Sequence, residues 1–320
     1  MQQPSSLARR RAIQFGLGLG AGLALARSPL AIAESLAEAA SGSGLIQKAI
    51  PSTGELLPVI GIGTARRYDV GETDYERAPL REVLDAFARM GGRLVDTAPS
   101  YGRAEAVVGD LVASLGNRDR LFLATKVGAG RDGREAGLAE MARSFERLRT
   151  ARIDLLQIHN LAGVEHMLPV LREWKQEGRI RYLGVSTSFK PQYEELERLM
   201  RSEALDFVQI DYAIDNREAE ERILPLAAER GMAVLVNLPF GRGRVFEAFR
   251  GHRIPDWATE LGIASWAQFV LKYVVSHPAV TCAIPGTATL RYLEDNLAAA
   301  RGQLPDAATR RRMVALIEAV

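Results

Sequence analysis

Short apolar runs rich in β-branched residues alternate along this chain with longer segments of helical period. Continuously apolar strands that are separated by helices are typical of a parallel sheet covered on both faces. The alternation therefore predicts repeated βα units. Eight such runs follow one another, at residues 60–64, 93–98, 121–127, 153–159, 182–186, 207–212, 233–239 and 280–285.

The segments between the runs have the spacing of amphipathic helices. Leu80, Val83, Leu84 and Phe87 stand at i, i+3, i+4 and i+7, and a helix stop, Gly91-Gly92, follows them. Residues 165–178 and 217–231 show the same pattern and the same glycine ending. Eight βα units in a chain of 320 residues favour a closed (β/α)₈ TIM barrel that forms a single domain.

A doubly wound open sheet is the competing fold. Such a sheet usually carries the motif G-x-G-x-x-G directly after its first strand, where the glycines allow a close approach to a nucleotide. In this chain Gly61-Ile62-Gly63-Thr64 follows a strand-like run, but the third glycine is missing. The sequence therefore favours the barrel.

Residues 1–33 have the pattern of an export signal. Arg9-Arg10-Arg11 precede an uncharged stretch rich in Gly, Ala and Leu, and Ala31-Ile32-Ala33 offers small residues at the spacing of a signal peptidase site. Paired arginines before a mildly apolar segment resemble a twin-arginine signal, which predicts periplasmic export of the folded protein by the twin-arginine machinery. A basic tail or an uncleaved interfacial anchor is the alternative. Residues 34–50 are predicted to form a linker, and residues 51–320 the barrel.

The charge balance changes once this leader is set aside. The whole chain has a formal net charge of +2, but residues 34–320 hold 37 basic and 39 acidic residues, a balance of −2. A barrel of this charge gives no reason to expect nucleic acid as a partner. Cys282 is the only cysteine, which excludes an internal disulfide and a metal site built from several cysteines.

Polar residues stand at the C-terminal ends of the predicted strands, where a TIM barrel builds its active site. Asp96 ends the second run and is followed by Tyr101, Lys126 lies at the end of the third run, and His159 ends the fourth. Taken singly, each has a structural explanation, such as a loop cap, a rim aromatic, a solvated cation or a core histidine. An acid, a phenol, an ammonium and an imidazole on consecutive strand ends point instead to one site.

These four side chains suit proton transfer to a carbonyl oxygen. An ammonium near a phenol stabilises the phenolate, so Lys126 is expected to make Tyr101 a usable proton donor, while Asp96 holds the lysine charged and in place. His159 can donate a hydrogen bond to the substrate oxygen. None of the four is a source of hydride, so a redox reaction at this site needs a cofactor.

From residue 57 to residue 296 the chain resembles the aldo-keto reductase family. The resemblance rests on Asp96, Tyr101, Lys126 and His159 in this order, within Val-Asp-Thr-Ala-x-x-Tyr-Gly, Thr-Lys and Gln-Ile-His. It implies a TIM-barrel enzyme that uses NAD(P)H to reduce an aldehyde or ketone, or to oxidise the alcohol. Tyr101 is the implied general acid or base, and a small-molecule carbonyl or alcohol the implied substrate.

The cofactor contacts that the resemblance implies match less evenly. Ser186 and Gln209 match positions that hold the nicotinamide carboxamide, whereas Thr187 stands where many members have Asn. Asn237 replaces the aromatic that stacks on the nicotinamide, and Gly286 replaces a lysine of many NADP-preferring members. The resemblance nevertheless favours NADP(H) over NAD(H). The complete set of implied cofactor-binding residues is Thr64, Ser186, Thr187, Gln209, Asn237, Leu238, Pro239, Phe240, Gly241, Pro285, Gly286, Thr287, Arg291, Asp295 and Asn296.

Two other functions stay open at this point. A nicotinamide-binding sensor or regulatory protein with negligible turnover is the second hypothesis, because Asn237 departs from the family pattern and a periplasmic nicotinamide pool is not assured. A cofactor-free hydrolase or isomerase has little support, since neither a metal-ligand cluster nor a nucleophile elbow is present. Trp257, Trp266, Phe240 and Phe246 are candidates for a hydrophobic substrate pocket, although core packing explains Trp266 and Phe246 equally well.

Overall fold

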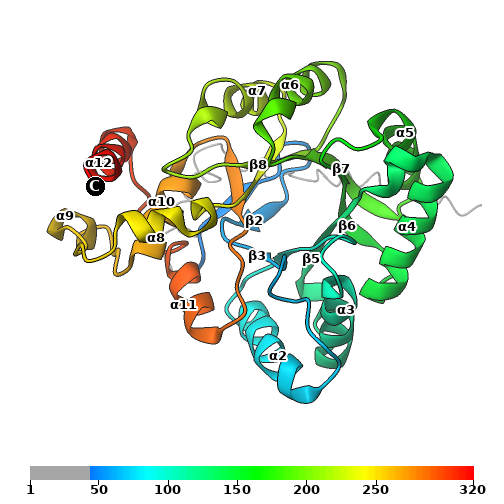
Figure 1. Ribbon diagram of the computed structural model, residues 1–320, viewed down its shortest axis with the longest axis horizontal. Coiled ribbons are helices and arrows are strands. Elements are labelled where there is room, and N and C mark those ends of the chain that lie inside the picture. The colour runs from blue at the N-terminus through cyan, green and yellow to red at the C-terminus, as the bar shows by residue number, and fades with distance from the viewer. Residues whose placement is uncertain (1–43) are drawn as a thin grey trace, which may run out of the picture. The chain divides into compact units, whose positions relative to one another are not determined.

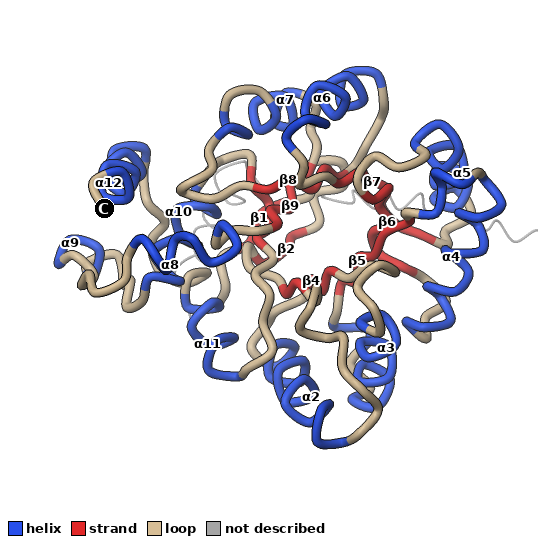
Figure 2. The backbone as a smooth tube through the Cα atoms, in the orientation of Figure 1, coloured by secondary structure: helices blue, strands red, loops and turns tan. Residues whose placement is uncertain are grey.

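The computed structural model describes residues 44–320 and confirms the TIM barrel (Figure 1). Eight parallel strands form one sheet in the order β10-β9-β8-β7-β6-β5-β4-β3, and the helices surround this ring (Figure 2). Each predicted run contributes one strand. The strands are β3 (Ile62–Gly63), β4 (Leu94–Asp96), β5 (Phe122–Val127), β6 (Ile153–His159), β7 (Ile180–Ser186), β8 (Phe207–Asp211), β9 (Ala233–Asn237) and β10 (Val280–Ala283).

The predicted helices form, with one shorter than expected. The segment 217–231 forms a 3₁₀ turn, η4 (Glu218–Glu220), which is followed by a short α-helix that begins only at Ile223. In a continuous α-helix the ring of Pro225 would clash with the carbonyl of Glu221, which explains the break before Ile223. The helices are α2 (Asp74–Arg89), α3 (Ala104–Leu115), α4 (Arg134–Leu148), α5 (Val164–Gln176), α6 (Tyr193–Ser202), α7 (Ile223–Glu229), α8 (Arg244–Ala248), α9 (Asp256–Thr259), α10 (Trp266–Ser276), α11 (Leu290–Ala298) and α12 (Ala307–Glu318).

The barrel closes between its first and last strands. Bridges pair Ile60 with Ala283 and Gly63 with Gly286, and the Gly63 amide donates to the carbonyl of Pro285 at 3.0 Å. A Cβ atom at Gly63 would lie 2.7 Å from the backbone oxygen of Ile284, closer than real side chains come. The glycine is therefore required here for the backbones to approach, and not for a nucleotide motif.

Alternate residues of each strand fill the inside of the barrel. Phe122 and Ala124 of β5 belong to the interior cluster, and Lys126 follows two residues later on the same face. Leu155 of β6 is likewise followed by Gln157 and then by His159. Because successive side chains of a strand point to opposite faces, the inward position after the apolar layers is the polar one. The polar side chains therefore gather at the C-terminal mouth.

An antiparallel hairpin closes the opposite end of the barrel. It consists of β1 (Gln47–Ala49) and β2 (Leu56–Pro58), and its residues Ile50 and Leu57 join the interior apolar cluster. The Lys48 ammonium anchors β1 by donating to the carbonyls of Val275, His277 and Val280 at 2.7–2.8 Å. The boundary between linker and barrel that the sequence places at residue 50 therefore falls inside this hairpin.

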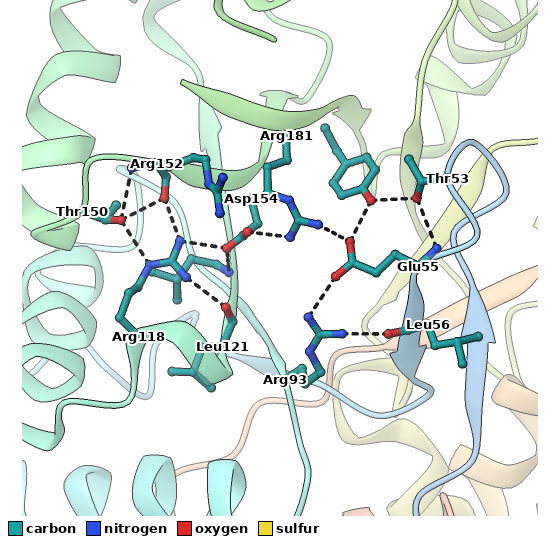
Figure 3. A network of polar contacts seen from close by, with 12 residues as sticks. Thr53, Glu55, Leu56, Arg93, Arg118, Leu121, Thr150, Arg152, Asp154 and Arg181 are labelled. Atoms are coloured by element: carbon teal, nitrogen blue, oxygen red, sulfur yellow. Dashed lines mark hydrogen bonds and ion pairs between the residues drawn. The ribbon is translucent and has the colours of Figure 1, made fainter. Parts of the chain in front are cut away.

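A fixed network of charges lies beside the hairpin (Figure 3). Glu55 accepts hydrogen bonds from Arg93 at 2.9 Å and from Tyr182 at 2.8 Å, and it also pairs with Arg181. Arg181 in turn reaches Asp154 at 2.9 Å, and Asp154 accepts from Arg118 at 2.9 Å. Each of the three guanidinium groups in this network therefore binds a carboxylate.

The predicted export signal, residues 1–33, lies outside the described residues and stays a prediction. Within residues 44–320 the helices are too short or too polar to cross a bilayer.

Candidate active site

A buried ion pair at the C-terminal mouth connects two neighbouring strands. Lys126 on β5 donates to both carboxylate oxygens of Asp96 on β4, at 2.9 and 2.7 Å, and to the carbonyl of Thr97 at 2.9 Å. The two side chains are only 1% and 2% exposed. Burial by itself would lower the pKa of Lys126, but the charge of Asp96 and the contact with Tyr101 outweigh this effect and raise the pKa. The lysine is therefore positively charged at neutral pH.

Tyr101 and His159 lie around this ammonium. The Lys126 nitrogen is 5.0 Å from the centre of the Tyr101 ring, and the rings of Tyr101 and His159 meet edge to face with centres 6.0 Å apart. The hydroxyl of Ser100 lies 3.4 Å from Nδ1 of His159. The structure therefore brings the four predicted catalytic side chains, which come from three strands and one loop, into one cluster.

The charge state of His159 follows from its surroundings. Burial, together with the positive charges of Lys126 and Arg131, lowers the pKa of His159 from 6.5 to about 4. The imidazole is therefore neutral at physiological pH and retains one N–H to donate. This N–H can donate a hydrogen bond to an oxygen on which negative charge develops.

The same pKa predicts how the stability of the protein depends on pH. Between pH 4 and pH 6.5, an unfolded chain protonates His159 while the folded chain does not, so the unfolded state binds more protons. The free energy of unfolding is therefore expected to increase as the pH rises through this window and to level off above about pH 6.5. Urea unfolding between pH 4.5 and pH 7.5 measures this gain.

The variant His159→Gln isolates the contribution of this residue. Because His277 also has a pKa lowered to about 4, by burial and by Arg310, part of the pH-dependent gain is expected to persist in the variant. A gain of the same size in the variant and in the natural protein would contradict the assignment to His159.

A cavity of about 790 Å³ opens at the barrel mouth beside Tyr101 and His159. Of the predicted cofactor-binding residues, seven line it: Thr64, Gln209, Asn237, Leu238, Pro239, Phe240 and Gly286. The wall also includes residues that the sequence did not single out: Ala65, Arg66, Arg67, Asn160, Ser188, Arg242, Gly243 and Ile284. A signal that could have found Arg66 and Arg67 is their place directly after the end of β3, in Thr64-Ala65-Arg66-Arg67, whereas Arg242 lies five residues beyond the end of β9.

The other predicted cofactor-binding residues lie outside this wall. The hydroxyl of Thr187 donates to Gln192 at 2.6 Å, and that of Ser186 faces the carbonyl of Ile158 at 3.5 Å. Gly241 lines a neighbouring cavity of about 500 Å³. The remaining residues of this group, found after β10 and on α11, are Pro285, Thr287, Arg291, Asp295 and Asn296.

The residues after β10 are engaged with other parts of the protein. Asn296 donates to the Thr287 hydroxyl at 3.0 Å, and this hydroxyl donates to the carbonyl of Pro285 at 3.2 Å. Asp295 accepts hydrogen bonds from Ser265 and Gln268 at 2.8 and 2.7 Å. These contacts hold the β10–α11 segment in place. Arg291 packs over the ring of Tyr292, with 5.1 Å to the ring centre.

A chain of side-chain amides connects Gln209 to the ion pair. Gln157 donates to the side-chain oxygen of Gln209 at 3.0 Å and lies 3.5 Å from a carboxylate oxygen of Asp96. Gln209 also forms a side-chain hydrogen bond with Asp96. Gln209 is therefore both a wall of the cavity and a support for the ion pair, a second role that sequence reasoning missed.

The aromatic candidates divide into two groups. Phe240 and Phe246 line the cavity, with ring centres 5.0 Å apart. Trp266 instead stacks on Phe249 with centres 3.8 Å apart, and Trp257 packs against Phe269. Core packing thus explains the two tryptophans, while the two phenylalanines give the cavity an apolar wall.

The cavity has the groups that a nicotinamide dinucleotide requires. The side-chain oxygen of Asn237 is buried without a hydrogen-bond partner, and space next to Gly286 is open, since a Cβ there would meet nothing nearer than 3.8 Å. Arg67 and Arg242 supply positive charge at the wall for phosphates. Residues 44–320 hold no cluster of His, Cys, Asp and Glu suited to a metal ion.

Comparisons with known proteins agree with this geometry. The model of the Aldo/keto reductase family matches residues 59–312, which include every barrel strand. Methylglyoxal reductase YeaE of Escherichia coli (strain K12) is 29% identical over 267 residues, covering 82% of this chain and 92% of that protein. An aldo/keto reductase of Klebsiella pneumoniae in complex with NADP and acetate is 26% identical with a TM-score of 0.72, covering 85% of this chain and 96% of that one. An aldo-keto reductase of Klebsiella pneumoniae in complex with NADPH is 27% identical with a TM-score of 0.72, and it covers the same shares of the two chains.

Proposed function

The chain belongs to the aldo/keto reductase family and is an NAD(P)-dependent oxidoreductase, and from this premise we propose that Tyr101 is its proton donor in the reduction of an aldehyde or ketone. The observation that carries the proposal is the buried Asp96–Lys126 pair with the Tyr101 ring 5.0 Å from the ammonium. NADPH, when bound, supplies the hydride.

The protein side chains divide the remaining work. Tyr101 transfers its phenolic proton to the substrate oxygen, and the Lys126 ammonium stabilises the phenolate that is left. Asp96 keeps this ammonium charged and in place inside the barrel. If Ser100 donates to Nδ1 of His159, the imidazole carries its proton on Nε2 and donates it in a hydrogen bond to the same substrate oxygen.

We further propose that the cofactor occupies the half of the mouth formed by β8, β9 and β10. Gln209 and Asn237 would hold the nicotinamide there, and Arg67 and Arg242 its phosphates. Arg67 passes beside Gly286, since its Cγ lies 3.9 Å from the position of a Cβ at that residue. An arginine at this place provides the positive charge that residue 286 lacks, and this supports a preference for NADP(H) over NAD(H).

Titration with NADPH and NADH, followed by quenching of tryptophan fluorescence, tests this proposal. Saturable binding is expected, tighter for NADPH than for NADH, and Arg67→Gln is expected to weaken NADPH binding about tenfold through the loss of a charge-assisted contact. Equal affinity for both nucleotides would contradict the cofactor preference. No binding of either nucleotide to folded protein would contradict the reductase function.

Export to the periplasm by the twin-arginine machinery is also our proposal. It is supported by the arginines at positions 9–11 and by the small residues at positions 31–33, and folding before export would let the barrel acquire its nucleotide in the cytoplasm. Within residues 44–320, Asn237 is the departure that motivates the alternative of a binding protein without turnover, and we propose instead that it holds the nicotinamide.

A further inference from the structure

The mouth of the barrel presents positive charge that the protein itself does not neutralise. Arg66, Arg67 and Arg242 line the cavity, and within residues 44–320 their side chains form no hydrogen bond or ion pair. The acid in the cavity wall is Asp96, whose charge Lys126 already balances. By contrast, Figure 3 shows the guanidinium groups of Arg93, Arg118 and Arg181 at the other end of the barrel bound to the carboxylates of Glu55 and Asp154. The charge at the mouth is therefore available to a ligand.

A fourth arginine lies in the turn that packs on the loop after His159. Arg131 belongs to the 3₁₀ turn η2 (Ala129–Asp132) that follows β5, and its exposed side chain has no partner among the described residues. This turn packs closely on the loop after β6. If Gly128 carried a Cβ atom, that atom would lie 3.8 Å from Cβ of His159. A Cβ atom at Gly163 would lie only 2.1 Å from a backbone atom of Gly130. The charge of Arg131 reaches the imidazole, where it contributes to the lowered pKa of His159.

The four arginines fall into two pairs. Arg67 lies beside Gly286, and Arg242 lies in the loop after β9. Both belong to the half of the mouth that we assign to the cofactor. Arg66 and Arg131 follow β3 and β5, the two strands that flank β4 and hence the loop of Tyr101. The segments that carry this second pair therefore lie on either side of the loop of Tyr101.

The backbone at Arg66 supports a role for its side chain. Arg66 has φ of +64°, in the left-handed region where a side chain other than that of glycine, asparagine or aspartate is unfavourable. Strained residues of this kind concentrate at functional sites, where the surroundings hold them in place. A long, charged, unpaired side chain at such a position, in the wall of the catalytic cavity, is best explained by a ligand that it binds.

We propose that the carbonyl substrate of this enzyme carries a carboxylate, which Arg66 and Arg131 bind while the carbonyl oxygen lies against Tyr101 and His159. Guanidinium groups bind planar carboxylates through paired hydrogen bonds, which fixes the orientation of the substrate as well as its place. Both arginines are exposed, so we place the carboxylate several atoms from the reacting carbon. The inference rests on the proposed reductase function.

The test compares two aldehydes that differ in one charge, 4-formylbenzoate and its methyl ester. The natural protein is expected to reduce the acid with the higher kcat/KM. Arg66→Gln and Arg131→Gln are each expected to lower the ratio of kcat/KM for acid over ester, and the double variant to lower it by about 10- to 100-fold. Removing Arg131 also alters His159, but this effect acts on both aldehydes and cancels in the ratio.

Arg120→Gln is the matched control, because Arg120 is an exposed arginine at the opposite end of β5 and the substitution changes the net charge equally. The acid-to-ester ratio is expected to stay within a factor of two in this variant. If the acid-to-ester ratio of kcat/KM were the same in the double variant as in the natural protein, the proposed carboxylate site would be overturned while the reductase function would stand.

A binding measurement separates this failure from a failure of the reductase function. Calorimetric titration of the NADPH complex with 4-(hydroxymethyl)benzoate and with its methyl ester requires no turnover, because cofactor and ligand are both in the reduced form. The acid is expected to bind more tightly than the ester, and the double variant to lose this difference. Equal affinities in the natural protein would overturn the proposal even if neither aldehyde were reduced.

Discussion

Tyr101→Phe is expected to lower NADPH-dependent carbonyl reduction by about two to four orders of magnitude, the range measured for loss of a general acid. The substitution removes only the hydroxyl, and the ring keeps its edge-to-face contact with His159 and its position 5.0 Å from the Lys126 ammonium. NADPH affinity and the urea midpoint of unfolding are therefore expected to stay close to those of the natural protein. Steady-state kinetics with a reactive aldehyde measure the effect.

Tyr75→Phe provides the control for this experiment. Tyr75 lies in the first turn of α2 and is 91% exposed, so the loss of its hydroxyl is expected to leave the rate unchanged. A Tyr101→Phe enzyme that kept more than about a tenth of the natural kcat would show that another group delivers the proton.

Lys126→Met is expected to have the largest effect on stability. It leaves the carboxylate of Asp96, which is 2% exposed, without its counter-charge inside the barrel. Breaking a buried ion pair by removing one partner costs about 3–5 kcal/mol of the free energy of unfolding. Urea unfolding at pH 7 measures this loss, and the variant is also expected to be inactive because the phenol of Tyr101 no longer faces an ammonium.

The double variant Asp96→Asn/Lys126→Met separates stability from catalysis. Since no buried charge is left unpaired, most of the lost free energy of unfolding is expected to return, while activity stays abolished. The exposed ion pair of Arg89 and Asp85 serves as the comparison for the buried pair. Asp85→Asn is expected to lower the free energy of unfolding by less than about 1 kcal/mol. A double variant that regained activity would exclude the lysine from the mechanism.

The catalytic cluster could be predicted from the sequence because its members sit on strands. A side chain two residues beyond an inward apolar residue must point inward as well, and Lys126 after Ala124 and Gln157 after Leu155 follow this rule. Parallel strands end on the same side of a barrel, so Asp96, Lys126 and His159 had to meet. Tyr101 lies five residues beyond Asp96 in a loop, so it was inferred from its place after a strand end and not from a period.

The cofactor contacts stay predictions, and some of the predicted residues bind other parts of the protein. Thr187 and Asp295 occupy the expected positions in the sequence, but the first donates to Gln192 and the second accepts from Ser265 and Gln268. Arg66 and Arg67 had no periodic signal at all. A loop has no fixed repeat, so the direction of each side chain depends on the elements that it packs against.

The eight βα units, the barrel and the strand-borne residues of the site follow from the amino-acid sequence, because residue periods of 2 and 3.6 report which face of a strand or helix is buried. The tertiary structure alone decided the closure between Gly63 and Gly286, the amide chain from Gln157 to Gln209, and the unpaired arginines around the mouth. These features join residues that are far apart along the chain. Their contacts are fixed by packing between elements, which no local pattern of residues encodes.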